Sequence, residues 1–480
     1  MDKEVLIGGS DVRIRNLQTR LPFEFGVVTM TEVPHCIVEL TCRINGKEAV
    51  GRAADHFPPK WLTKDPEQSL AEEAKVISEV LQQACEHAKG VRGESVFDVW
   101  YQVYAVQREW GKGTAHPPLL WTFGSAFVER ALIDAYCRAE GVSFGDAVRR
   151  GQLGIRLGEI YPELEGENPA RYLSEAPSKS IEVRHTVGHE APLTGEVDGP
   201  EDGLPVTLEE NVRCYGVTKF KLKIAGDIDE DRERVRTILH LLDEICDDYR
   251  ITLDANEQYS SVGALRTLIH RLCSDSSISQ FGKKLLFVEQ PFSRDIALSA
   301  RIGRKLKEWE DRPPIIIDES DAHLDSCRTA LDKGYAGTSH KNCKGVFKSI
   351  INKCLLEHRR QKKPEKAFIL SAEDLTTIGP ISLQQDLAVA GTLGISHVER
   401  NGHHFFRGLD AFENGVQRAV LDAHGDLFVR HEKGFVTLNV VDGTIVLDSV
   451  LGAPFGYQFS GEVLNDVSRF ERVTKWEPPV

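Results

Sequence analysis

The sequence predicts an α/β protein, with a (β/α)8 barrel of TIM type and an α+β N-terminal capping domain completed by the C-terminal segment. Three observations support this fold class. Eight short apolar or β-branched runs alternate with longer helical segments between residues 181 and 410. Several of these runs end in a charged side chain. The regions on either side mix strands and turns without this alternation, which indicates a separate unit around a parallel barrel.

The composition is typical of a globular protein with two or more domains. The chain has 480 residues, 41% hydrophobic and 28% charged, with a formal net charge of −14. This charge argues against a nucleic-acid partner, because basic patches drive phosphate binding. The ten cysteines form no CxxC pair and are expected to be reduced, buried thiols. Without an apolar leader or an apolar run of about 18 residues, we expect a cytoplasmic protein with no membrane partner.

The first third of the chain, residues 1–150, is interpreted as the capping domain. A polar turn is expected at Asn45–Gly46, between two strand-like runs. Apolar residues from Ala126 to Ala135 recur at helical spacing. In chain order, the expected elements are strands in 11–29 and 35–54 and helices in 66–90 and 124–150.

Residues 181–410 are interpreted as the barrel. The expected strands are 181–188, 217–224, 250–256, 285–291, 314–320, 335–341, 367–374 and 396–401. The helical stretches between them include 228–247, 261–273, 295–309, 321–333, 344–361 and 380–393. A doubly wound open sheet is the alternative to a closed barrel.

Two flanking segments complete the predicted organisation. Residues 189–205, rich in Pro, Gly and acidic residues, follow the first barrel strand and are expected to form a loop on its C-terminal side. Residues 411–480 show strands and turns but no helical pattern. We expect this last segment to rejoin the capping domain or to close the barrel.

Three successive barrel strands each end in a carboxylate: Asp254, Glu289 and Asp318. Active sites of such barrels form at the C-terminal ends of the strands, so these side chains should converge. Three unpaired acids would repel one another, and a hard divalent cation held by oxygen ligands resolves that repulsion. Each acid could instead only cap the helix that follows it, since Asp is a good N-cap. Carboxylates at the ends of three successive strands favour a Mg²⁺ site.

Lysines follow on two opposed strands. Lys221 and Lys223 alternate by two on the second strand, so both point to one side of it. In the barrel interior, mutual repulsion, a nearby metal and burial would lower a lysine pKa toward that of a general base. Lys341 ends the sixth strand, on the other side of the barrel. Glu319 is expected to hydrogen-bond Lys341, and Lys344 to be a surface helix residue.

Further polar residues at strand ends are candidates for substrate contact. They are Glu399 on strand 8, Ser371 and Glu373 on strand 7, Asn256 beside Asp254, and Glu319. His397, His403 and His404 match no metal-ligand spacing, and the two latter residues are placed in a loop. No GxGxxG, GxxxxGK[ST] or GxSxG motif occurs in a strand–turn–helix context, so dinucleotide, P-loop and serine-hydrolase functions have no support.

At these positions the chain resembles the enolase superfamily, in its muconate-lactonizing and mandelate racemase-like branches. The matching motifs are KLKI at 221–224, DAN at 254–256, EQP at 289–291, DES at 318–320 and HKNCKG at 340–345. The helix at 128–141 and the N-terminal TRLPFEFGVVTMTE are also similar to the family's pattern. The resemblance covers most of the chain.

The resemblance implies a role for each matched residue. Asp254, Glu289 and Asp318 would hold Mg²⁺. Lys223 would be one acid/base catalyst, tuned by Lys221, and Lys341 would act on the opposite face. Capping-domain loops around Pro22–Phe25 and Asp55–Pro59 would close over the substrate.

The chain also departs from the family's pattern. The DAN and EQP motifs are separated by a polar insert, residues 274–285. Val346 stands where a second glycine is usual. Strand 8 carries His397 and Glu399 where dipeptide epimerases have paired aspartates, which argues against that activity.

The sequence leaves three functions open. The first is a racemase or epimerase that removes the α-proton of a carboxylate substrate to give an enediolate and returns a proton on the other face. The second is a lyase, a dehydratase or cycloisomerase, with the same first half-reaction. The third is a barrel that binds a ligand without turnover. The expected partners are a small-molecule carboxylate and further copies of this chain in a homo-oligomer.

Overall fold

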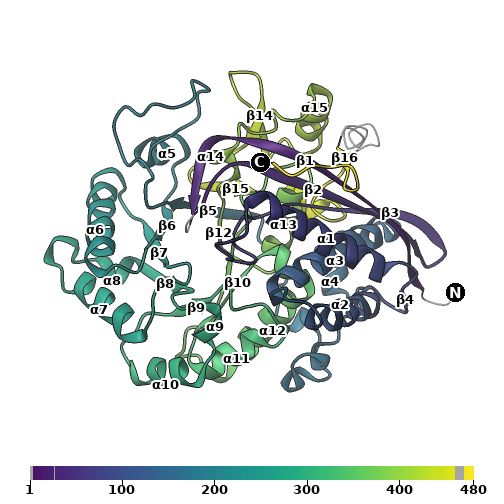
Figure 1. The fold of residues 1–480 in the computed structure, drawn as a ribbon, viewed down its shortest axis with the longest axis horizontal. Helices are drawn as coiled ribbons and strands as arrows, with labels where there is room; N and C mark the ends of the chain where they lie inside the picture. Colours follow the sequence, from purple (N-terminus) through teal and green to yellow (C-terminus); the bar gives the residue numbers. More distant parts are fainter. Residues whose placement is uncertain (1–3, 26–27, 460–469, 480) are drawn as a thin grey trace.

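The computed structural model describes residues 4–25, 28–459 and 470–479. Eight parallel strands form a closed barrel, because the last of them, β12, pairs with the first, β5. An antiparallel sheet and a group of helices lie against one side of the barrel (Figure 1). The predicted fold class is therefore confirmed, and the open-sheet alternative is wrong.

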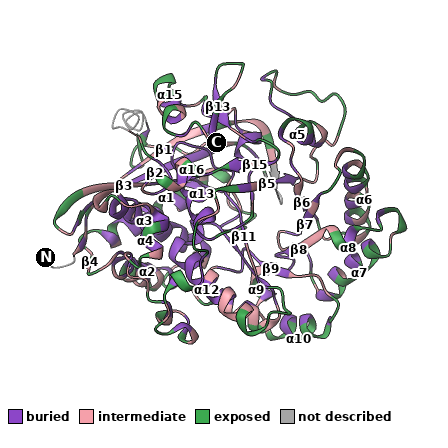
Figure 2. Ribbon diagram, turned by 180° about the vertical axis from the view of Figure 1, so that it is seen from behind, coloured by how far each residue is buried: buried purple, intermediate pink, exposed green. Residues whose placement is uncertain are grey.

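All eight barrel strands form within the predicted runs, in the predicted order. They are β5 (Ser180–Val187), β6 (Lys219–Lys223), β7 (Arg250–Asp254), β8 (Leu285–Glu289), β9 (Ile315–Ile317), β10 (Gly337–His340), β11 (Ile369–Ala372) and β12 (His397–Glu399). Most of their apolar residues are buried, as expected of parallel strands covered by helices. The described helices show exposed residues along their outer surfaces (Figure 2).

Helices follow the barrel strands and cover the sheet. They are α5 (Leu208–Tyr215), α6 (Ile228–Ile245), α7 (Val262–Cys273), α8 (Phe281–Lys284), α9 (Arg294–Ala297), α10 (Ala300–Glu308), α11 (Ser326–Lys333), α12 (Val346–Lys362), α13 (Ser382–Thr392) and α14 (Gly402–Phe405). The polar insert at 274–285 forms a 3₁₀ turn, Ser276–Ile278, and α8, with Phe281 buried beneath. No helix of the described chain has the length and apolarity needed to cross a membrane.

The N-terminal cap contains long strands packed on helices. Its elements are β1 (Val5–Phe25), β2 (Val28–Ile44), β3 (Lys47–His56), α1 (Leu70–Ala88), β4 (Arg92–Gly93), α2 (Val96–Lys112), α3 (Pro118–Glu140) and α4 (Phe144–Arg149). The turn between β2 and β3 has Asn45 and Gly46 both at positive φ, which matches the right-handed twist of a hairpin. Three 3₁₀ turns, Leu157–Glu159, Pro162–Leu164 and Pro169–Arg171, lead into the barrel.

The C-terminal segment contacts both units. It contains α15 (Asn414–Ala423), β13 (Phe428–Arg430), β14 (Val436–Leu438), β15 (Thr444–Val446), α16 (Asp448–Gly452) and β16 (Glu471–Arg472). β15 pairs with β5 of the barrel, and β16 pairs with β1 of the cap. The expectation that helices end near residue 410 is wrong. Val416 and Val420 lie one turn apart and are buried in α15, but this helix is too short for its period to stand out in the sequence.

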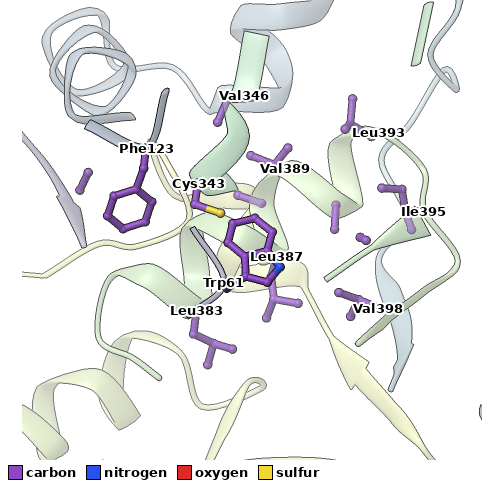
Figure 3. Packing of buried hydrophobic residues seen from close by; sticks show 14 of the residues in the cluster. Trp61, Phe123, Cys343, Val346, Leu383, Leu387, Val389, Leu393, Ile395 and Val398 are labelled. Atoms are coloured by element: carbon purple, nitrogen blue, oxygen red, sulfur yellow. The ribbon is translucent and has the colours of Figure 1, made fainter. Parts of the chain in front are cut away.

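The hydrophobic core is continuous across the cap and the barrel. Figure 3 shows a part of it in which Trp61 and Phe123 of the cap lie in one cluster with Leu387 and Val389 of α13. Close approach requires glycine at one point of the cap: a Cβ at Gly51 of β3 would lie 2.0 Å from the carbonyl oxygen of Ala131 in α3. This packing holds the ends of β2 and β3 over the barrel mouth. Seven cysteines are buried, Cys246 is half-buried, and Cys214 and Cys273 are exposed.

Candidate active site

Five carboxylates meet at the C-terminal ends of the barrel strands. Asp254 ends β7, Glu289 ends β8 and Glu399 ends β12, while Asp318 and Glu373 directly follow β9 and β11. All five side chains are buried. The predicted convergence of acids is therefore present. It includes Glu373, which the sequence suggested only as a substrate contact.

Lys221 lies at the centre of these acids. Its Nζ is 2.9 Å from Asp254 Oδ2, 3.0 Å from Glu289 Oε2, 2.9 Å from Glu373 Oε2 and 2.8 Å from Glu399 Oε2. Burial alone would lower the pKa of Lys221, but the four carboxylates together raise it well above its usual value. The expectation of a lowered pKa at this residue is wrong here, because carboxylates rather than the neighbouring lysine surround the ammonium group.

The other two predicted lysines border the same cavity from opposite sides of the barrel. Lys223 Nζ donates to Asp254 Oδ2 at 2.5 Å and to Asn256 Oδ1 at 2.7 Å. Lys341 Nζ donates to Asp318 Oδ2 at 2.7 Å and to Glu373 Oε2 at 2.6 Å. Burial opposes the charged form of Lys341, and the charges of Asp318 and Glu373 outweigh this effect and raise its pKa.

The donor set fits a divalent cation. Carboxylate oxygens of Glu289, Asp318 and Glu373 lie within 4.8 Å of one another. Both oxygens of Glu289 are buried without a hydrogen bond from the described residues, although Lys221 lies at ion-pair distance. Burial and the charge of Glu373 raise the pKa of Glu289 well above its usual value. Asp254, the third predicted ligand, is outside this group, and its Oδ2 is bound by Lys221 and Lys223.

Two expectations about neighbouring residues are wrong. Glu319 does not bind Lys341; its Oε1 accepts a hydrogen bond from Asn256 Nδ2 at 3.2 Å. Burial, with the charges of Asp318 and Glu257, raises the pKa of Glu319 to about 7. Lys344 is not a surface residue. It is buried behind Asp318, where its Nζ donates to Asp318 Oδ1 at 2.9 Å and to Ser339 Oγ at 3.0 Å.

The remaining candidates divide between the cavity and the barrel interior. Glu399 and Asn256 line the cavity with Glu373. Ser371 does not line it, because its hydroxyl accepts from Arg184 Nη2 at 3.0 Å within the barrel. His397 contacts the same arginine at 2.6 Å. His403 and His404 are buried in α14, and neither lines this cavity.

The cavity has a charged floor and an apolar roof, with a volume of about 70 Å³. We define the floor as the lining residues of the barrel and the roof as those of the cap. The floor includes Lys221, Lys223, Asp254, Asn256, Asp318, Lys341, Glu373 and Glu399, and the roof includes Phe23, Met30, Val33, His56, Pro58, Pro59 and Trp61. The loops around 22–25 and 55–59 were expected here, but no pattern in the sequence indicates Val33 or Trp61. Glu373 was identifiable as a possible ligand by the rule that identified Asp254, a carboxylate at a strand end.

A closed parallel barrel, covered by an α+β cap and carrying acids and lysines at its strand ends, defines a capped (β/α)8-barrel protein with a charged site at the barrel mouth. Residues 206–342 match the family model described as enolase C-terminal domain-like. Over this region, from α5 to the residues that directly follow β10, the chain is similar to that family. No curated protein matches the chain in sequence.

Several solved structures share the fold over nearly the whole chain. A muconate lactonizing enzyme from Pseudomonas fluorescens superposes with a TM-score of 0.59 and 13% identity, covering 97% of this chain and 99% of that one. An N-succinyl Arg/Lys racemase from Bacillus cereus gives 0.58 and 14%, covering 96% and 98%. An enolase from Bradyrhizobium in complex with magnesium and mandelic acid gives 0.57 and 14%, covering 98% and 99%. At these identities the likeness establishes the fold.

Proposed function

We propose that this protein is a Mg²⁺-dependent enzyme that removes the α-proton of a carboxylate substrate to give an enediolate, and that it acts as a racemase or epimerase. The observation that carries the proposal is the position of two lysines. Lys223 from β6 and Lys341 from β10 come from opposite sides of the barrel and line one cavity with the carboxylates. A substrate carbon between them is accessible to an amine on each face.

The proposed metal ligands are Asp254, Glu289 and Asp318, with Glu373 as a further oxygen donor beside Glu289 and Asp318. The chemistry that Mg²⁺ supplies when bound is Lewis-acid stabilisation of the negative charge that develops on the substrate carboxylate. Both oxygens of Glu289 are buried without a hydrogen bond from the described residues, and Lys221 forms an ion pair with one of them; this supports a cation at this position, because a buried carboxylate with few partners is costly. The fold is also shared with a Bradyrhizobium enolase that binds magnesium.

The lysines move the protons. In one direction, the neutral amine of Lys223 takes the α-proton, and the electron pair of the C–H bond passes into the enediolate. The ammonium group of Lys341 then donates a proton to the same carbon from the opposite face, which inverts the configuration. Each positioned acid or base contributes typically 10²–10⁴-fold to the rate. Asn256, which accepts from Lys223 Nζ and donates to Glu319, holds the Lys223 side chain toward the cavity.

The proposal is tested by hydrogen exchange. The protein would be incubated with Mg²⁺ in deuterium oxide and a library of N-acyl amino acids, dipeptides, acid sugars and hydroxy acids, and the products would be analysed by mass spectrometry. Gain of one deuterium at otherwise unchanged mass, abolished by Lys223→Ala and by Lys341→Ala, is the expected result. Loss of water or cyclisation would replace the racemase proposal by the lyase alternative. Absence of exchange together with absence of Mg²⁺ binding by calorimetry would contradict the mechanism and favour a binding protein.

A further inference from the structure

Helix α12 begins in the protein interior without a capping side chain of its own. Its first two residues, Val346 and Phe347, are fully buried. The backbone N–H groups in the first turn of a helix have no partner within that helix. The residue before this turn is Gly345, which has no side chain that could accept a hydrogen bond. The start of α12 therefore needs an acceptor from elsewhere in the protein, because a buried amide without a partner is costly.

Glu129, in the middle of helix α3 of the cap, is that acceptor. It lies 217 residues before Val346 in the chain. Its Oε2 accepts a hydrogen bond from Val346 N at 3.1 Å, and its Oε1 accepts one from Phe347 N at 2.6 Å. The carboxylate is buried, and its charge is favourable beside the partial positive charge of a helix N-terminus. An acid of the cap thus serves as the N-terminal cap of a barrel helix.

The backbone before α12 is shaped to this contact. Gly345 has a φ of 110°, a conformation that favours glycine. A Cβ at this position would lie 3.2 Å from Glu129 Oε2 and would crowd the carboxylate. Cys343 and Val346, on either side of Gly345, belong to the same buried cluster as Phe123 of α3 (Figure 3). Helix α3 therefore holds this turn by packing as well as by hydrogen bonds.

The turn carries a lysine of the floor. Lys341 directly follows β10, and residues Asn342–Lys344 form a 3₁₀ turn that leads to α12. Within it, Lys344 N donates to Lys341 O at 2.9 Å, and Gly345 N donates to Asn342 O at 3.1 Å. These hydrogen bonds leave little freedom between Lys341 and the start of α12. The position of that helix end therefore fixes the backbone of Lys341.

We propose that Glu129 is a positioning residue for Lys341: by capping α12, it fixes the turn that holds this lysine on the floor. Glu129 does not line the cavity and acts only through this turn. Lys223 comes from β6, on the opposite side of the barrel, and its position should not depend on Glu129. The inference rests on the proposed function for the part that Lys341 plays in proton transfer. It adds that a residue of the cap supports one of the two lysines.

The position of Lys341 is measured without the proposed reaction. The full-length protein would be labelled with a trace of acetic anhydride, and the modification of Lys341 and Lys223 would be compared by mass spectrometry of peptides. In Glu129→Ala the turn loses its acceptors, and Lys341 separates from Asp318 and Glu373. An ammonium group that loses carboxylate partners is more often neutral and reactive, so the Lys341-to-Lys223 labelling ratio should rise at least about fivefold.

Two further variants show whether the effect belongs to the capping contact. Glu129→Gln keeps one acceptor oxygen and should keep the labelling ratio within about twofold of the wild type. Asp134→Ala is the matched control. Asp134 is also a buried carboxylate of α3, but it accepts from Arg52 N at 2.9 Å and from Tyr457 Oη at 2.8 Å. Its removal costs similar buried hydrogen bonds and leaves α12 capped, so the ratio should again stay within about twofold.

The kinetic constants provide a second measurement, made with the best substrate of the exchange library. Glu129→Ala should lower kcat at least about tenfold and change KM less than about threefold, because a displaced Lys341 impairs proton transfer while the remaining floor still binds the carboxylate. Glu129→Gln should restore most of kcat. A variant that is only less stable would show neither the selective loss of kcat nor the selective labelling of Lys341.

Two outcomes would overturn the inference: an unchanged labelling ratio in folded Glu129→Ala, or an equal rise in Asp134→Ala. If Glu129→Ala does not fold, backbone amide hydrogen exchange of the wild type decides, because unprotected amides at Val346 and Phe347 would contradict the capping contact. The test is separable from that of the proposed function. A raised labelling ratio without α-proton exchange of any carboxylate would remove the proposed reaction and leave the support of Lys341 by Glu129 intact. Normal α-proton exchange in Glu129→Ala would do the reverse.

Discussion

The floor and the roof of the active-site cavity differ in how their polar groups are satisfied. On the floor, Lys221 contacts four carboxylates, and Lys341 contacts two. On the roof, the one titratable side chain among the described lining residues, His56, forms no ion pair, and burial lowers its pKa to about 3. The floor is built from the ends of barrel strands, and the roof from the end of β1, the beginning of β2, the end of β3 and the chain that follows β3.

Because of this difference, we expect the floor to determine the rate of the proposed reaction and the roof to determine which ligand binds. A network in which charges hold one another in place keeps the reacting groups in fixed positions, which catalysis requires. In a wall of apolar side chains, a single neutral imidazole that forms no ion pair within the protein remains available to bind a ligand. Substitutions on the floor should therefore change rates and stability, whereas substitutions on the roof should change which ligand binds.

The largest effect is expected from the floor lysines. Lys223→Ala and Lys341→Ala should each lower the rate of α-proton exchange by at least about 100-fold, because each removes a positioned acid or base. The rate would be measured by mass spectrometry in deuterium oxide with the best substrate of the library. Lys219→Ala is the matched control: Lys219 lies on the same strand as Lys223, but it pairs with Glu182 at 3.0 Å away from the cavity. A comparable loss in this control would contradict the assignment.

The second prediction concerns Lys344, which lies behind the floor and binds Asp318. Lys344→Met removes the ammonium group that binds Asp318 Oδ1 and leaves that buried carboxylate with fewer partners. The free energy of unfolding without Mg²⁺ should fall by about 3 kcal/mol, because breaking a buried ion pair strands a charge. Urea denaturation measures this value. Lys353→Met, on α12, removes a partly exposed pair with Glu357 and should cost less than about 1 kcal/mol. Equal losses in the two variants would show that Lys344 does not support the floor.

The third prediction tests whether buried imidazoles, such as that of His56, stay neutral. Burial lowers the pKa of His403 to about 3, below its ordinary value of 6.5. The stability contributed by the neutral ring is fully present above pH 6.5 and is lost as the pH falls, because only the unfolded chain takes up the proton. Each such histidine lowers the free energy of unfolding by about 1.4 kcal/mol per pH unit below 6.5. Between pH 7 and pH 5, His403→Phe should thus lose about 2 kcal/mol less unfolding free energy than the wild type.

The measurement is urea denaturation at both pH values. His240→Phe, at an exposed position of α6, is the control and should lose as much as the wild type. If the unfolding free energy of His403→Phe falls between pH 7 and pH 5 by as much as that of the wild type, His403 is protonated in the folded protein as readily as in the unfolded chain.

The smallest effect is expected where the roof contacts the floor. Lys341 Nζ lies 5.1 Å from the centroid of the Trp61 ring. Trp61→Leu removes this cation–π contact, worth about 0.5–1 kcal/mol at such sites, and should lower the exchange rate about two- to fivefold. Trp61→Phe keeps an aromatic face and should retain most of the rate. A loss as large as that of Lys341→Ala would mean that roof and floor do not act separately.

Much of the floor was predictable, because the positions of its residues follow from the alternation of strands and helices and from the topology of a parallel barrel. Parallel barrel strands end at the same rim, so Asp254, Glu289 and Lys341 could be brought together without coordinates. Which charged side chains pair with one another at that rim was not predictable. Lys221 carries four ion pairs, and Lys344 lies inside the protein, because side-chain direction and local density decide which charges meet. The local sequences, Lys-Leu-Lys at 221–223 and Lys-Asn-Cys-Lys at 341–344, give no sign of either.

The strand order, the convergence of acids and lysines, and the two lysines on opposed strands were determined by the sequence itself, since alternation and strand-end chemistry are local properties. Only the tertiary structure decided that Glu373 joins Glu289 and Asp318, that Ser371 binds Arg184 and Glu319 binds Asn256, and that His56, Met30 and Trp61 belong to the roof. These contacts join residues far apart in the chain. They depend on how the cap packs on the barrel, and no local pattern encodes that packing.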